Sequence, residues 1–118
     1  MEKYTLKKSE RLSQKKLIEE LFDKGSSFYL YPFKVFFLAS DKPTSQLMAS
    51  VPKSNFKRAV DRNIIKRRIR EGYRLNKAKL GSDNFFSIAY IYTAKEILPS
   101  ALIHQKIVLS FDKLISQK

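Results

Sequence analysis

The segment 53–79 is the part of the chain whose residue types and spacing could do chemistry. It carries eleven Lys or Arg and only two acids. Read as a helix, it places Arg62, Lys66 and Arg70 one turn apart on one face, so that like charges meet at each i,i+4 step. This repulsion lowers helix stability unless a polyanion neutralises it. We therefore expect this face to bind phosphates, whose contacts with Lys and Arg release counterions.

The opposite side of the same helix is predicted to be buried. At about 100° per residue, one stripe collects Ile65, Ile69, Gly72, Tyr73 and Asn76. Gly72 lowers helix stability by about 1 kcal/mol relative to Ala, and we expect it to mark a close approach of helix to sheet. A solvated surface helix would also explain the charges, but such helices normally alternate Lys with Glu. A membrane-surface helix would need large apolar side chains where Gly72 and Asn76 stand.

Side chains suited to enzymatic chemistry are scarce in the rest of the chain. There is no Cys, the one histidine is His104, and the three glycines are isolated. Thiolate or zinc sites, nucleophile–base pairs and glycine-rich phosphate loops are therefore not assembled. We expect no catalytic residue, no metal site and no small-molecule substrate on this chain, and we interpret His104 as structural.

Composition limits the class of protein. The chain has 118 residues, 43% of them hydrophobic, and a formal net charge of +13, which predicts a single domain over 1–118 with its own core. An isoelectric point near 10.0 indicates a partner such as nucleic acid or an anionic membrane. The first residues lack the apolar stretch of a signal peptide, and no apolar run is long enough to span a membrane. We expect a cytoplasmic protein without membrane contact.

The residues before the basic segment predict a short helix. It is expected to start from an N-cap at Ser13, run to Lys24 and end at Gly25 in the left-handed conformation. Its apolar side chains form two rows. The row of Ile18 and Phe22 belongs either to the core or to a binding surface.

Three strands are predicted, over 33–40, 46–52 and 85–94. The first two are expected to form an antiparallel hairpin, with Pro32 at an edge or a bend. Alternation along the first strand divides its side chains between two faces, with Phe33, Val35 and Phe37 on one face and Lys34, Phe36 and Leu38 on the other.

Two further helices complete the predicted order. The basic helix is expected to be capped by Ser54 or Asn55. A closing helix should hold Pro99 in its first turn and bury an apolar stripe made of Ile103, Ile107, Phe111 and Leu114. The order α-β-β-α-β-α predicts a helix-covered sheet of the α+β class.

These residues together resemble a known family. The segment 58–71 reads RAVDRNIIKRRIRE; it follows SVPK at 50–53 and a first helical segment that ends LFDKG at 21–25. The pattern Arg-Asn-x-x-Lys-Arg-x-x-Arg, in this order of elements, resembles that of the bacterial ribonuclease P protein component. The resemblance spans nearly the whole chain.

The resemblance implies a fold and a function. The family fold is a two-layer α-β sandwich similar to a ribosomal-protein domain, with a left-handed crossover through the basic helix, although general handedness rules favour a right-handed one. The family's protein assists a catalytic RNA that removes the 5′ leader from precursor tRNA with Mg²⁺. The implied partners are ribonuclease P RNA and precursor tRNA, and no cofactor is expected on the protein itself.

The resemblance also implies the site residues. Those matched to RNA binding are Arg58, Arg62, Asn63, Lys66, Arg67, Arg70 and Arg74, and those matched to a leader-binding cleft are Ile18, Phe22, Phe36 and Lys53. Two positions depart from the family pattern, because Ile64 stands where Arg is frequent and Ile18 where Phe is common. A general RNA-binding or ribosomal protein without a role in tRNA processing is the alternative, and it would bind mixed RNAs without preference.

Overall fold

The structure is a computed structural model that describes residues 10–40, 45–80 and 85–116. Its elements in chain order are α1 (Lys15–Lys24), β1 (Ser26–Leu30), β2 (Phe33–Ala39), β3 (Gln46–Ser50), α2 (Ala59–Asn76), a short 3-10 helix η3 (Lys77–Leu80), β4 (Phe86–Tyr92) and α3 (Ser100–Ser116). The α+β class is confirmed, with one strand more than predicted. None of the helices among these residues is long and apolar enough to cross a membrane.

The four strands form one sheet in the order β1-β2-β4-β3. β2 is antiparallel to β1 and to β4, whereas β3 runs parallel to β4. The predicted antiparallel hairpin between 33–40 and 46–52 is therefore wrong, because β4 lies between β2 and β3. The parallel pair requires a crossover, and α2 provides it between β3 and β4. That this crossover is left-handed stays a prediction.

The sequence pattern does not predict β1. Its side chains alternate between exposed and partly buried only from Ser27 to Leu30, and none of the five is fully buried. The strand exists because all five residues pair with β2, from Ser26 opposite Phe37 to Leu30 opposite Phe33. The turn between the two strands contains the cis peptide bond of Tyr31–Pro32, so Pro32 lies at a bend, as predicted.

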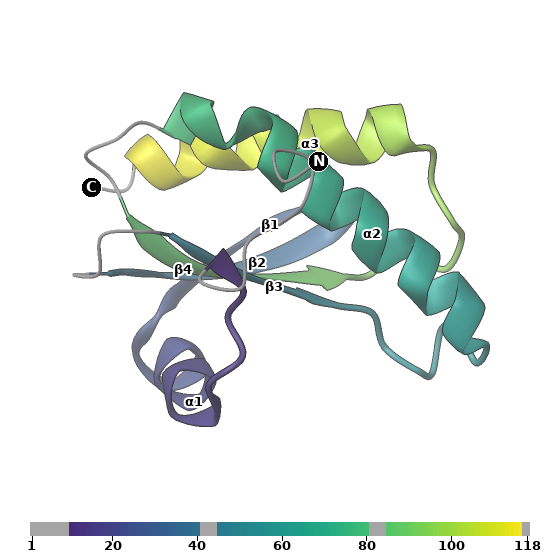
Figure 1. Ribbon diagram of the computed structural model, residues 1–118, viewed down its shortest axis with the longest axis horizontal. Coiled ribbons are helices and arrows are strands. Elements are labelled where there is room, and N and C mark those ends of the chain that lie inside the picture. The colour runs from purple at the N-terminus through teal and green to yellow at the C-terminus, as the bar shows by residue number, and fades with distance from the viewer. Residues whose placement is uncertain (1–9, 41–44, 81–84, 117–118) are drawn as a thin grey trace.

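The helices lie on both sides of the sheet (Figure 1). α2 and α3 cover one face together, whereas α1 lies alone against the other. The main core fills the space between the sheet and the α2–α3 layer, and it includes the stripe of α3 that was predicted to be buried: Ile103, Ile107, Phe111 and Leu114. A smaller cluster, with Leu12, Leu21 and Ala89 buried, lies under α1.

α1 begins and ends differently from the prediction. Gln14, not Ser13, occupies the N-cap position, and its side chain forms no capping hydrogen bond. Gly25 has φ of −75° and is extended, so the left-handed ending is wrong. Glycine is required here for space, because a Cβ on Gly25 would lie 2.3 Å from the carbonyl oxygen of Leu21 and 2.8 Å from that of Phe37.

The other helix starts also need correction. α2 begins at Ala59 with Arg58 at its N-cap and no side-chain cap, so Ser54 and Asn55 do not cap it. Pro99 precedes the first residue of α3, and its carbonyl accepts the Ile103 N–H at 3.1 Å.

Gly72 marks a contact between helices, not the predicted contact between helix and sheet. A Cβ on Gly72 would lie 2.9 Å from both His104 Cδ2 and Ile107 Cδ1 of α3. The missing side chain therefore allows α2 and α3 to approach. His104 is part of this contact, and its Nε2 is buried with no hydrogen-bond partner among the described residues.

Candidate nucleic-acid interface

α2 is oriented by its apolar stripe. Ile65, Ile69, Gly72 and Tyr73 are buried as predicted. Asn76, the last member of the stripe, is half-buried, and its side-chain amide donates to the Gly72 carbonyl at 2.9 Å. Because one side of the helix is fixed against the core, the cationic side must face outward.

The outward side carries most of the residues matched to RNA binding. Asn63, Arg67 and Arg70 are exposed, and Lys66 and Arg74 are half-buried. Among the residues that the structure describes, neither Lys66 nor Arg67 forms an ion pair. These two cations are therefore available to the phosphates of a partner.

Two of the predicted RNA-binding arginines have contacts within the protein. Nη1 of Arg62 donates to the carbonyl oxygens of Phe56 at 2.7 Å and Lys57 at 3.0 Å. Nε of Arg58 lies 4.0 Å from Asp61 Oδ2 one turn away. Arg62 thus holds the segment before α2 to the helix, a role that residue type and spacing do not reveal.

Arg11 is a further cation at this surface that the sequence did not single out. It forms an isolated bridge with Leu47 at the edge of β3, and the Leu12 N–H donates to the Leu47 carbonyl at 2.8 Å. Partial desolvation of its guanidinium, together with the positive charge of Arg11, lowers the pKa of Arg70. Two guanidinium groups from distant parts of the chain thus repel each other, which an anionic ligand would relieve.

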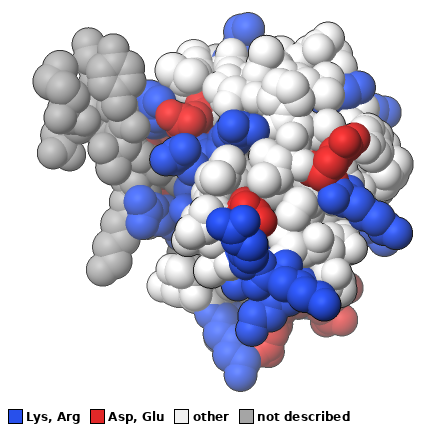
Figure 2. All heavy atoms as spheres, turned by 90° about the vertical axis from the view of Figure 1, so that its right-hand side faces the viewer, with Lys and Arg blue, Asp and Glu red and all other residues white. Residues whose placement is uncertain are grey.

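The cations extend beyond α2 itself. Figure 2 shows the side of the molecule at which α2 begins, where many Lys and Arg side chains lie, with several Asp or Glu side chains between them. Arg68 lies at the border of the cationic face. Its Nη1 donates to the Leu98 carbonyl at 2.7 Å, so its guanidinium is directed toward the protein and not toward a bound phosphate.

A second candidate surface lies on the other side of the sheet, where α1 packs. The rings of Phe22 and Phe36 contact each other edge to face, with centroids 4.8 Å apart and planes at 67°. Phe22 is 39% exposed, and Ile18 and Phe36 are partly buried members of the cluster under α1. The structure therefore brings the three predicted apolar cleft residues together and leaves the Phe22 ring accessible.

The cation next to these rings is Lys34. Its Nζ lies 5.4 Å from the centroid of the Phe36 ring, within the range of a cation–π interaction. Lys53, the predicted cation of the cleft, is exposed in the turn that follows β3, and no contact with the rings is found for it among the described residues. Alternation along β2 could have identified Lys34, since it shares a face with Phe36.

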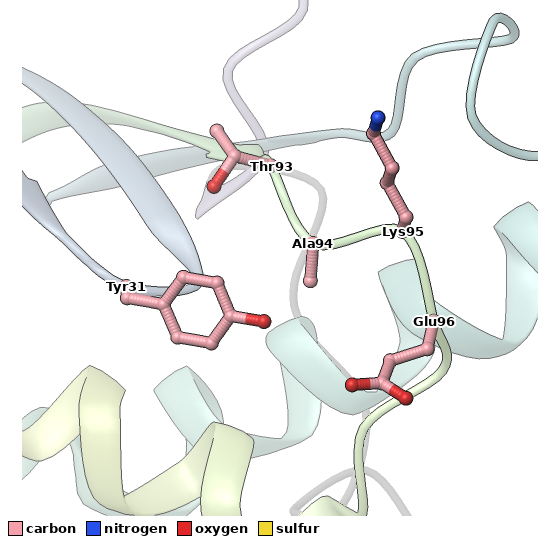
Figure 3. A pocket seen from close by; sticks show the side chains of 5 residues that line it. All are labelled: Tyr31, Thr93, Ala94, Lys95 and Glu96. Carbon is pink, nitrogen blue, oxygen red and sulfur yellow. The ribbon is translucent and has the colours of Figure 1, made fainter.

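The structure also has an open hollow that none of the predicted site residues lines. It holds about 480 Å³ and is lined by Tyr31, Thr93, Ala94, Lys95 and Glu96. Figure 3 shows the Tyr31 ring directed toward Ala94 and Glu96, while Lys95 points away from it. This hollow lies where the β1–β2 turn meets the end of β4.

Comparisons with known proteins agree with the geometry. The family model described as Ribonuclease P matches residues 6–114. The ribonuclease P protein component of Porphyromonas gingivalis is 37% identical over 102 residues, which cover 80% of this chain and 74% of that protein. That of Petrotoga mobilis is 36% identical over 90 residues, 76% of this chain and 70% of the relative.

Solved structures of RNase P proteins have a fold similar to that of this chain. The RNase P protein of Staphylococcus aureus superposes with a TM-score of 0.77 at 25% identity, covering 91% of this chain and 98% of that one. The Thermotoga maritima protein has a TM-score of 0.77 at 26% identity, covering 88% and 96%. With the fold, the basic face of α2 and these relatives in agreement, the chain belongs to the ribonuclease P protein component family.

Proposed function

We propose that this chain binds ribonuclease P RNA through the outward side of α2. The residues assigned to this contact are Arg58, Arg62, Asn63, Lys66, Arg67, Arg70 and Arg74. The observation that carries the proposal is the rotation of α2: the buried stripe from Ile65 to Tyr73 turns Lys66 and Arg67 outward without an acidic partner among the described residues. Cations held in this way lose their mutual repulsion when they neutralise phosphates.

The second part of the proposal concerns precursor tRNA. Ile18, Phe22 and Phe36 form an apolar platform beside Lys34, with Lys53 in the turn beyond β3. Single-stranded nucleic acid binds to surfaces that combine cations with apolar or aromatic side chains. Mature tRNA lacks the single-stranded 5′ leader, so this platform distinguishes precursor from product.

In this proposal the RNA subunit carries out the cleavage, and the protein positions the substrate. The Mg²⁺ needed for hydrolysis is held by the RNA. Among the described residues, no group of three or more His, Asp or Glu side chains could hold a metal ion. The contribution of the chain is to neutralise phosphates and to hold the leader, which promotes 5′ maturation of tRNA.

Reconstitution tests the function. The chain is combined with a bacterial ribonuclease P RNA, and cleavage of the 5′ leader is measured at low Mg²⁺. We expect cleavage to increase strongly when the chain is added. The variant Arg67→Ala should weaken RNA binding and reduce the salt dependence of affinity by about one unit of slope.

A matched control separates a specific surface from general charge. Lys113→Ala removes a cation from α3, where Lys113 lies 5.6 Å from the Phe28 ring, and should leave RNA affinity unchanged. The proposal is wrong if the chain fails to stimulate cleavage, or if Lys113→Ala and Arg67→Ala weaken binding equally. Equal competition by unrelated RNAs would favour a general RNA-binding protein.

A further inference from the structure

The outer face of the β1–β2 hairpin continues past the platform of Ile18, Phe22 and Phe36. Tyr29 of β1 pairs directly with Lys34 of β2, and directly paired residues of antiparallel strands lie on the same face. Lys34 in turn shares its face with Phe36, two residues along the strand. Lys34 therefore neighbours both rings on this face, with Phe36 two residues along β2 and Tyr29 directly opposite on β1.

Tyr29 is both accessible and held in place. Its side chain is 58% exposed, and its hydroxyl lies 3.1 Å from Thr93 Oγ1 at the end of β4. Thr93 is itself fixed, because its hydroxyl donates to the Pro32 carbonyl at 2.9 Å and its N–H donates to the same oxygen at 2.7 Å. An exposed ring that is anchored at its tip loses little freedom when a ligand stacks on it.

The spacing suits the next unit of a chain-like ligand. Ser27 lies opposite Phe36 and Tyr29 opposite Lys34, so Tyr29 and Phe36 are diagonal neighbours, roughly 7–8 Å apart. A strand that passes diagonally from Phe36 to Tyr29 therefore runs beside Lys34. The cation suits a phosphate between two bases, since Lys contacts phosphate as a point charge.

We propose that Tyr29 and Lys34 form a second stacking position for the single-stranded 5′ leader, one step farther from the tRNA body than Phe22 and Phe36. The inference rests on the proposed function and adds a dependence on leader length to it. Stacking on an aromatic side chain accepts any base, so this position recognises the length of the leader and not its sequence. A formal net charge of +13 favours RNA over a protein partner at this face.

The experiment compares two precursor tRNAs bound to the reconstituted holoenzyme. One has a leader just long enough to reach Phe36, and the other has a leader several nucleotides longer. We expect Tyr29→Ala to lower affinity for the longer leader about tenfold, equivalent to about 1.4 kcal/mol, and to leave the shorter one unchanged. Tyr29→Phe keeps the ring and should retain most of the affinity. Lys34→Gln should reduce the salt slope for the longer leader by about 1.

Tyr31→Ala is the matched control. Tyr31 is 47% exposed, belongs to the same hairpin and lines the hollow of Figure 3 instead of the platform, so its loss should not change the affinity for either leader. Equal effects of Tyr29→Ala on both leaders, or equal effects of the two tyrosine variants, would overturn the inference. An unchanged affinity of Tyr29→Ala for the precursor with the longer leader would also overturn the inference.

Phe36→Ala distinguishes failure of this inference from failure of the proposed function. If Phe36→Ala weakens binding of both precursors and Tyr29→Ala has no effect, the leader platform exists and ends at Phe36. If neither variant affects either precursor, the proposed leader-binding platform is wrong, and so is the inference that extends it.

Discussion

Phe36 and Phe37 are neighbours in the sequence and lie on opposite faces of β2. Phe37 is buried in the main core, where its ring contacts Phe28 and Phe86. Phe36 lies on the α1 side against Phe22. Residue type does not separate these two roles, but alternation along the strand does, and the predicted assignment of the two faces is confirmed.

Replacing these two rings should therefore have different consequences. Phe37→Ala removes a buried ring and should lower the free energy of unfolding by about 3–5 kcal/mol. Phe36→Ala removes a half-buried ring, so we expect a smaller loss of stability and a selective loss of affinity for precursor tRNA over mature tRNA. Chemical denaturation and binding by the holoenzyme measure the two effects. Unfolding of Phe36→Ala, or equal weakening of both RNAs, would contradict the placement of the leader surface.

Arg62 shows what residue spacing cannot predict. The motif places it among the RNA-binding cations, whereas the structure also gives its Nη1 two backbone carbonyl acceptors, those of Phe56 and Lys57. A hydrogen bond from a charged group contributes about 1.5–3 kcal/mol. Whether a guanidinium meets phosphate or its own backbone depends on how the turn before α2 folds, and no local pattern contains that information.

Arg62→Ala should consequently lower both stability and RNA affinity. We expect a loss of about 1–3 kcal/mol in the free energy of unfolding, whereas Arg67→Ala, at an exposed position, should change it by about 0.5 kcal/mol or less. Thermal or urea denaturation of the free protein measures this difference. If the two variants are equally stable, the contacts of Arg62 do not support the turn.

At the scale of elements, the helices were predicted better than their ends. The buried stripe of α2 and that of α3 follow from a period of 3.6 residues, and both are confirmed. The caps at Ser13, Ser54 and Asn55 are wrong, because Gln14 and Arg58 occupy the N-cap positions of α1 and α2 and form no side-chain capping hydrogen bond. Helix ends depend on the path of the chain into the next element, which sequence periodicity does not describe.

Gly25 gives a prediction at this scale. Its φ of −75° is open to any residue, so Gly25→Ala is opposed by what a Cβ would meet: chiefly the backbone carbonyls of Leu21 and Phe37, and also Leu21 Cδ1 at 3.1 Å. Backbone atoms cannot move aside as a side-chain end can, so we expect a loss of about 1–3 kcal/mol and displacement of α1 from β2. Denaturation and the affinity for precursor tRNA would report both changes.

A glycine-to-alanine change at an exposed loop position would neither lower stability in this way nor displace α1. Wild-type stability in Gly25→Ala would mean that α1 is less closely docked than the structure indicates. Loss of leader affinity with retained affinity for the ribonuclease P RNA would show that α1 positions one surface and not the other.

At the scale of the whole molecule, strand order was the part that sequence could not supply. Each predicted strand overlaps one that exists, but the insertion of β4 between β2 and β3 depends on contacts between segments far apart in the chain. β1 is short, has no fully buried residue and pairs along its whole length with β2. The resemblance to a family supplied the crossover that local reasoning missed.

The core that joins these elements contains three tyrosines with titratable hydroxyls. Burial raises the pKa of Tyr73 to about 12, and the nearby Glu10 carboxylate adds to the shift, while a hydrogen bond with Ser45 opposes it. Burial likewise raises the pKa of Tyr90 and of Tyr92. The hydroxyl of Tyr90 lies 2.7 Å from Ser110 Oγ of α3, so this group in its protonated form connects the sheet to α3.

The fold should therefore lose stability in alkali. Because the pKa of Tyr73 is higher in the folded chain than in the unfolded one, its contribution is fully present below about pH 10 and is lost as the pH rises toward about 12. For a shift of this size the loss is of the order of 2–3 kcal/mol. Urea denaturation at a series of pH values should show the decline, and Tyr73→Phe, which has no group to ionise, should make it shallower. An identical pH dependence in Tyr73→Phe and wild type would mean that Tyr73 does not resist ionisation in the folded core.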